Sequence, residues 1–83
     1  MSVSDKLFER TRNILARELN VDRARIVAGA KLREDLGMDS VIALNLIFAA
    51  ERELEITIPE KDVVALDTVG DLEALLSRLS TAI

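Results

Sequence analysis

The sequence predicts an all-α fold, a small bundle of three longer helices and one short helix. Apolar residues recur at helical spacing in three segments, near residues 4–20, 40–55 and 69–83. The glycines and the single proline lie between these segments or near their ends, and no stretch alternates long enough to form a paired strand. Each helix has one apolar side, so the helices must bury these sides against one another. With 83 residues and no repeat or linker, we expect one domain over residues 1–83.

The first helix is expected to start at Ser4, a residue type that often caps helices, and to run to about Asn20. The residues at i, i+3 and i+4 spacing form a single buried stripe, which contains Leu7, Thr11, Ile14, Leu15, Glu18 and Leu19. Residues 21–38 show no sustained period and contain two glycines. We therefore predict a long loop with a short turn at most, pinned by Val21, Ile26 and Leu32. A loop of this length is uncommon in so small a domain and is often functional.

The second helix is expected to open at Asp39 or Ser40 and to end near Glu55. Its predicted core stripe consists of Ala43, Leu44, Ile47, Ala50 and Leu54. Another face mixes apolar and polar residues, so part of it should be exposed; it contains Val41, Asn45, Phe48 and Arg52.

Apolar and polar residues alternate over residues 56–58 as they do in a strand, but this run is too short and has no partner strand. Pro59 suits the first turn of a short third helix over about residues 60–65. Thr68 and Asp71 have the spacing of a capping box, which predicts the start of the last helix. One side of that helix should be buried, and it contains Val69, Leu72, Leu75, Leu76, Leu79 and Ile83.

Composition excludes several classes of function. The chain has no cysteine and no histidine, so nucleophilic sites that need either residue, zinc sites built on them and haem ligation through them are absent. Two phenylalanines are too few for a platform that stacks nucleobases. Residues 33–60 contain two bases and seven acids, a net charge of −5, which repels nucleic acid and attracts basic partner surfaces.

We expect neither a leader peptide nor a membrane span. Its first residues are polar, and its longest apolar stretch, residues 41–50, is interrupted by Asn45 and is far shorter than the roughly 20 residues of a span. We therefore expect a soluble, cytoplasmic and monomeric protein.

Residues 35–41, Asp-Leu-Gly-Met-Asp-Ser-Val, place a serine at a helix start after a glycine-containing turn. On helix preferences alone, a capping role accounts for either Asp39 or Ser40. The segment also resembles the phosphopantetheine attachment site of the acyl carrier protein family, where an Asp-Ser-Leu-type motif follows an Asp-Leu-Gly turn. The resemblance continues in the same order through residues 51–59, Glu-Arg-Glu-Leu-Glu-Ile-Thr-Ile-Pro, and residues 68–72, Thr-Val-Gly-Asp-Leu. It covers nearly the whole chain and implies a four-helix carrier rather than an enzyme.

The resemblance implies that a phosphopantetheinyl transferase moves 4′-phosphopantetheine from coenzyme A onto the hydroxyl of Ser40. The terminal thiol of this arm would hold an acyl-type cargo as a thioester and present it to a loading ligase and a downstream synthase or transferase. Such an arm would import the reactive sulfur that a chain without cysteine lacks. Asp39 matches the family's acidic residue before the serine, which implies a role as a cap or as a transferase contact.

The chain departs from fatty-acid carriers just after the serine. Those carriers place acidic residues on the outward face of the second helix, where this chain has Ile42 and Asn45. Exposed apolar groups at a fixed site suggest docking, although the size of Phe48 fits a core position equally well. We expect partner contacts in a specialised pathway from Val41, Ile42, Asn45, Phe48 and Glu51.

Other functions stay open at this point. Residues 40–44 also resemble peptidyl carrier domains of non-ribosomal synthetases, which would imply an amino acid as cargo, loaded by a dedicated ligase. A helical adaptor without any prosthetic group could bind a partner through the second helix. A DNA-binding helix-turn-helix ranks last because the middle of the chain is acidic.

Overall fold

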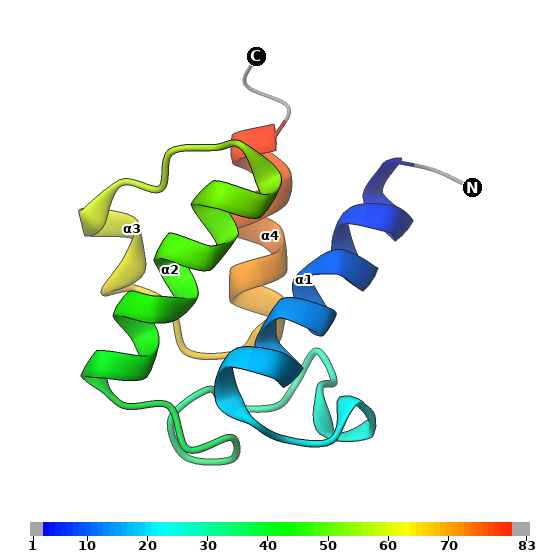
Figure 1. Ribbon diagram of the computed structural model, residues 1–83, viewed down its shortest axis with the longest axis vertical. Helices are drawn as coiled ribbons and strands as arrows, with labels where there is room; N and C mark the ends of the chain where they lie inside the picture. The colour runs from blue at the N-terminus through cyan, green and yellow to red at the C-terminus, as the bar shows by residue number, and fades with distance from the viewer. Residues whose placement is uncertain (1–2, 81–83) are drawn as a thin grey trace.

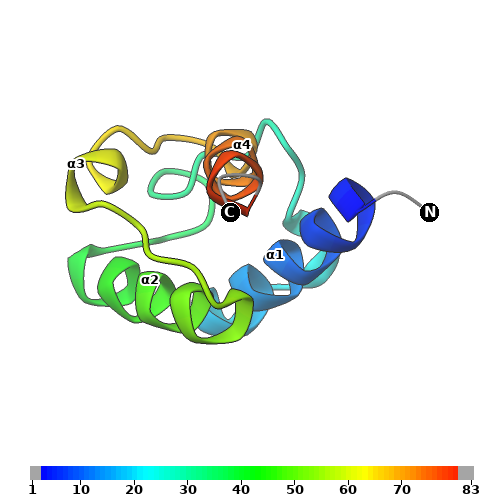
Figure 2. The same ribbon diagram turned by 90° about the horizontal axis from the view of Figure 1, so that it is seen from above.

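A computed structural model describes residues 3–80 and confirms the predicted helical bundle (Figure 1). Its elements are α1 (Val3–Leu19), a 3-10 turn (Arg23–Arg25), α2 (Ser40–Leu54), α3 (Glu60–Val63) and α4 (Val69–Ser80). Figure 2 shows α1 and α2 on one side of the bundle, α4 across from them, and α3 at the edge farthest from α1. None of the helices described between residues 3 and 80 has both the length and the apolar content that crossing a bilayer requires.

Helices α1 and α4 bury the sides that their sequence spacing predicts. On α1 the buried residues are Leu7, Thr11, Ile14, Leu15 and Leu19, and Glu18 is half-buried. On α4 the predicted residues Val69, Leu72, Leu75 and Leu76 are buried and Leu79 is half-buried, while Ile83 lies outside the described residues. One detail is corrected: α1 begins at Val3, so the proposed capping residue Ser4 lies inside the helix.

The predicted core stripe of α2 is confirmed at Ile47 and Ala50 and is wrong at Leu44. Its buried residues are Leu46, Ile47, Ala49 and Ala50, whereas Leu44 is 54% exposed. Ala43 and Leu54 are only half-buried and pack against the edge of the core. The physical reason is that apolar residues occupy most sides of this helix, so their spacing alone does not single out one face.

The long loop before α2 is fixed to the start of α4. Ile26 and Leu32 are buried as predicted, and Val21 is half-buried against the core. The amide of Leu32 donates to Asp67 O (2.8 Å), and the amide of Gly70 donates to Ala28 O (2.9 Å). A Cβ at position 70 would lie 3.2 Å from Ala28 O, so glycine permits this close approach.

A partly buried ion pair joins α1, the loop and α4. Arg12 Nε lies 2.6 Å from Glu73 Oε2, and Arg12 Nη2 lies 3.1 Å from Glu73 Oε1. Arg12 Nη1 also donates to Ile26 O in the loop (3.3 Å). Only 4% of Glu73 is exposed, and this paired, hydrogen-bonded geometry is the one in which a buried carboxylate is tolerated.

Helix α3 is shorter than predicted. It spans four residues, ends at Val63 instead of near residue 65, and contains no buried residue. Pro59 directly precedes its first residue, and residues 56–58 form an irregular connection instead of a strand. The helix is tied to α4 through Arg78 Nη2, which lies 3.1 Å from Asp62 Oδ2.

A reciprocal capping box starts α4, as the spacing of Thr68 and Asp71 predicts. The amide of Asp71 donates to Thr68 Oγ1 (3.1 Å), and the amides of Thr68 and Asp67 donate to Asp71 Oδ2 (3.0 and 3.1 Å). The two backbone bonds, from Thr68 first and then Asp67, hold the pKa of the Asp71 carboxyl below its ordinary value of 3.8. The ionised form of Asp71 therefore stabilises the folded chain.

We expect the stability that Asp71 contributes to be complete at neutral pH. It should be lost as the pH falls from the unfolded-state pKa of about 3.8 through the lower folded value, because the folded state then has to take up a proton. Asp71→Asn should remove this part of the acid dependence, measured as urea unfolding between neutral pH and pH 3. Asp22→Asn is the matched control, since the side chain of Asp22 makes no capping bond. An unchanged acid dependence in Asp71→Asn would contradict the assignment.

Candidate functional site

A tight turn leads into α2 and sets the position of the helix start. The amide of Gly37 donates to Arg33 O (3.2 Å), and the amide of Met38 donates to Leu32 O (2.9 Å). Leu36 and Met38 are buried on either side of Gly37 and pin the turn to the core. Gly37 has a φ of +74°, a left-handed conformation that glycine adopts without steric cost. The Asp-Leu-Gly sequence thus makes the turn itself.

Asp39 and Ser40 form the first turn of α2. Asp39 has extended backbone angles, and its Oδ1 accepts a hydrogen bond from the amide of Ile42 (2.8 Å), so its carboxylate caps the helix. Ser40 is the first helical residue and is exposed. Because Asp39 satisfies the cap, the hydroxyl of Ser40 is not needed for it.

Ser40 lies at the rim of an open groove between α2 and α3. The groove has a volume of about 580 Å³. Its walls come from the turn before α2, from one side of α2 and from the segment around α3, and they consist of Arg33, Ser40, Ala43, Leu44, Ile47, Phe48, Glu51, Ile58, Glu60, Val63 and Val64. Along α2, Glu51 lies eleven residues after Ser40, which is roughly 16 Å at the rise of an α-helix. Most of the lining is apolar, so the groove is suited to an apolar chain that enters from Ser40.

Exposed apolar side chains surround this groove. Val41 is 68% exposed, Phe48 is 55% exposed, and Val64 is 83% exposed. Leu44, Phe48 and Val64 line the groove, and Val41 directly follows Ser40 on α2. The exposure of Phe48 argues against a core position and leaves its ring available at the surface.

The other residues predicted to contact partners are placed less uniformly. Asn45 is exposed, but Ile42 is half-buried and packs against the core, so only part of its side chain reaches solvent. Glu51 is half-buried, and its Oε2 accepts a hydrogen bond from the amide of Ile58 (2.9 Å). Glu51 therefore also holds the connection from α2 to α3.

Two further acidic residues of the middle segment are engaged inside the molecule. Glu53 forms an ion pair with Arg17 of α1, and Arg10 donates to Glu53 O. The hydrogen bonds from Arg17 lower the pKa of the Glu53 carboxyl. Asp35 Oδ2 accepts from the amide of Lys31 (2.8 Å). The charge of Glu53 is thus largely matched within the fold.

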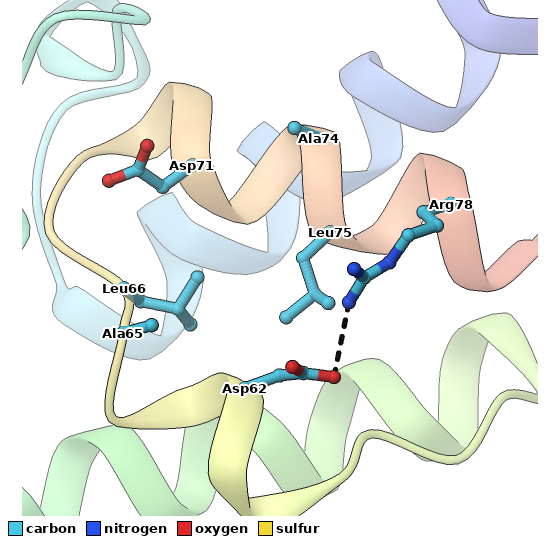
Figure 3. A pocket seen from close by; sticks show the side chains of 7 residues that line it. All are labelled: Asp62, Ala65, Leu66, Asp71, Ala74, Leu75 and Arg78. Carbon is cyan, nitrogen blue, oxygen red and sulfur yellow. Dashed lines mark hydrogen bonds and ion pairs between the residues drawn. The ribbon is translucent and has the colours of Figure 1, made fainter.

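A second hollow lies on the other side of α3, against α4 (Figure 3). Its volume is about 340 Å³, and it is lined by Asp62, Ala65, Leu66, Asp71, Ala74, Leu75 and Arg78. Figure 3 shows the ion pair of Asp62 and Arg78 bridging this hollow from α3 to α4. Helix α3 therefore stands between two spaces, one beside α2 and one beside α4.

Sequence reasoning did not find several groove residues. Arg33, Ile58, Val63 and Val64 come from segments before and after α2, and only the folded chain brings them together. Leu44 was assigned to the core, although its side chain lines the groove. One signal in the sequence could have indicated an exposed apolar surface: α2 contains more apolar residues than one buried face requires.

Comparison with known proteins agrees with this geometry. The family model described as "Phosphopantetheine attachment site" matches residues 9–76. An acyl carrier protein of Saccharopolyspora erythraea is 36% identical over 81 residues, which cover 93% of this chain and 85% of that protein. An acyl carrier protein of Treponema pallidum is 40% identical over 67 residues, covering 81% and 86%.

A solved structure shows the same likeness in three dimensions. A Mycobacterium tuberculosis protein, assigned provisionally as an acyl carrier protein, superposes with a TM-score of 0.82 at 33% identity, covering 87% of this chain and 96% of its own. The family model spans most of this chain, and both the sequence relatives and the fold agree with it. The chain belongs to the acyl carrier protein family, whose members are carriers rather than enzymes, are modified by phosphopantetheinyl transferases and bear covalently bound 4′-phosphopantetheine.

Proposed function

We propose that Ser40 is the attachment residue and that the protein carries an acyl-type cargo for a specialised pathway. The observation that carries this proposal is the position of Ser40. This serine is exposed at the start of α2 and lines the end of the apolar groove. A thioester on the arm would hold the cargo, and partner enzymes would load it and take it over.

The residues around Ser40 fit the prosthetic group. The cap of α2 is made by Asp39, so modification of the Ser40 hydroxyl breaks no hydrogen bond of the helix start. In the transfer, a bond forms between Ser40 Oγ and the phosphorus next to the pantetheine, and the diphosphate bond of coenzyme A breaks. Adenosine bisphosphate leaves, and the serine proton passes to the transferase. When bound, the group supplies a thiol, which this chain lacks.

The groove supports an acyl cargo over an amino acid. Its walls beside Ser40 consist mainly of alkyl and aromatic side chains, such as Leu44, Ile47 and Val63. Burial of apolar surface stabilises an acyl chain there by about 25 cal/mol for each Å² removed from water. A small polar amino acid would gain little from the same walls.

An acyl chain on the arm should shift the NMR methyl signals of Leu44, Ile47 and Val63. The proteins to compare are the acetyl and octanoyl forms, prepared by transfer from the corresponding coenzyme A thioesters. The methyls of Leu19, a buried residue outside the groove, are the internal control. If the octanoyl form leaves all groove methyls where the acetyl form has them, the chain stays in solvent and the acyl proposal is wrong.

Partner choice is expected to depend on Asn45, which is exposed where fatty-acid carriers present a carboxylate. Asn45→Glu should improve turnover by generic fatty-acid enzymes up to about fivefold and impair turnover by the true partner, since an exposed charge pair contributes ~0.2–1 kcal/mol. Ile42→Asp is a poorer test because Ile42 packs against the core. The control variant is Thr57→Glu, which adds the same charge in an exposed connection outside the groove.

A single kinetic result would contradict the specialised role. If the unmodified sequence already supports fatty-acid elongation as well as a standard carrier does, the housekeeping role replaces the specialised one. Kinetic comparison of both loaded carriers with the same elongation enzymes decides between these roles.

A further inference from the structure

One arginine stands apart from the others in the described part of the chain. Within residues 3–80, the guanidinium of Arg33 makes no hydrogen bond or ion pair. The other seven arginines each have a partner: Arg10 with Glu53 O, Arg12 with Glu73, Arg17 with Glu53, Arg23 with Asn13, Arg25 with Asp35 O, Arg52 with Glu53, and Arg78 with Asp62. Arg33 is exposed and lines the same groove as Ser40.

The fold holds Arg33 next to the segment that ends at Ser40. The backbone carbonyl of Arg33 accepts from Gly37 N (3.2 Å), and the preceding carbonyl of Leu32 accepts from Met38 N (2.9 Å). Residues 32 and 33 therefore lie beside residues 37 and 38, just before the start of α2. This places the Arg33 side chain on the groove wall at the Ser40 end.

The carboxylates nearest in sequence are already engaged elsewhere. Glu34 pairs with Lys31 Nζ (3.4 Å), Asp35 accepts from the amide of Lys31, and Asp39 caps α2. Of the two carboxylates that line the groove, Glu51 accepts from the amide of Ile58, and Glu60, at the start of α3, makes no ion pair with Arg33 in the described residues. An arginine in such acidic surroundings that still has no partner is available for an anion brought from outside.

We propose that Arg33 binds the phosphodiester that links the arm to Ser40; this inference rests on the proposed attachment at Ser40. Modification puts a phosphorus one bond from Ser40 Oγ and adds a negative charge to a turn that already carries Asp35 and Asp39. A guanidinium offers a planar pair of donors that matches two phosphate oxygens, and its charge offsets the added one. Arg33 then acts as a positioning residue, which keeps the base of the arm at the mouth of the groove.

The test compares apo and holo protein by two nuclear signals. Mass spectrometry first establishes that one arm is present. In the holo protein, the Nε–H signal of Arg33 should move and exchange with water severalfold more slowly than in the apo protein. The ³¹P signal of the phosphodiester should shift in Arg33→Gln relative to the unsubstituted chain. That difference should shrink in about 1 M salt, where the screening length is near 3 Å.

Matched variants separate a specific contact from a general charge effect. Arg52→Gln removes the same charge from an exposed arginine of α2 that does not line the groove, and it should leave the ³¹P signal unchanged. Arg33→Lys should restore part of the shift, since it keeps the charge but loses the planar pair of donors. Both side chains are exposed, so circular dichroism should show folded proteins.

The outcomes distinguish this inference from the proposed function. If no arm is added to the chain at all, the attachment proposal itself fails. If the arm is present and Arg33→Gln leaves the ³¹P signal unchanged, the role of Arg33 is overturned while the carrier function stands. A response of the Arg33 signal to a succinyl cargo, with none to the free-thiol arm, would also overturn the assignment, because the anion would then be a cargo carboxylate.

Discussion

Ser40→Ala should abolish the addition of phosphopantetheine completely. The residue lies at the first position of α2, and its hydroxyl is the group to which the transferase would join the phosphorus. Incubation of the apo-protein with coenzyme A and a broad transferase should add one arm to the unsubstituted chain and none to the variant. Intact-protein mass spectrometry measures both.

The variant should also remain folded, which makes the result interpretable. Asp39 and not Ser40 supplies the capping bond to Ile42 N, so the far-ultraviolet circular dichroism of Ser40→Ala should be nearly unchanged. Ser80→Ala, in the last described turn of α4, removes a serine hydroxyl far from this motif and should still accept the arm. An arm found on Ser40→Ala would reassign the attachment to another residue.

Arg12→Ala should have the largest effect on stability among single charge changes. It leaves Glu73 buried without its partner, and breaking a buried pair in this way costs about 3 kcal/mol. For a domain of this size, such a loss lowers the Tm by more than about 10 °C. Urea and thermal unfolding at neutral pH measure the difference.

Two further variants identify the unpaired carboxylate as the cause. Arg12→Met combined with Glu73→Leu should recover most of the lost stability, because apolar residues of similar volume often replace a buried pair without loss. Arg17→Ala breaks the more exposed pair with Glu53 and should change the unfolding midpoint little. If the double variant is as unstable as Arg12→Ala, the unpaired carboxylate of Glu73 is not the cause of the loss.

Local signals in the sequence predicted the parts of the fold that depend on neighbouring residues. The capping box of Thr68 and Asp71 starts α4 as expected, because its hydrogen bonds join residues three apart. The start of α2 follows from the same logic at Asp39. The stripes of α1 and α4 were predictable since each has one apolar side, and burial selects that side.

The features that join distant segments could not be predicted in this way. Leu44 was predicted to be buried but is exposed, and Leu46 is buried without having been predicted, because α2 is apolar on most sides and only its neighbours decide which side is buried. The pairing of Arg12 with Glu73 spans 61 residues, and nothing in the sequence links the two charges. The groove was missed for the same reason, since its walls meet only after the chain has folded.

The position of α3 between two hollows has a consequence for the dynamics of the bundle. None of its four residues is buried, and in the pair that ties it to α4 the Arg78 side chain is exposed while that of Asp62 is half-buried. We therefore expect its local opening to cost less free energy than global unfolding, and its amides to exchange hydrogen before those of α1 or α4. A shift of α3 toward α4 would exchange volume between the hollows without disturbing the core. We therefore expect the volume of the groove beside Ser40 to depend on the position of α3, which contains no buried residue, more than on the packed interior.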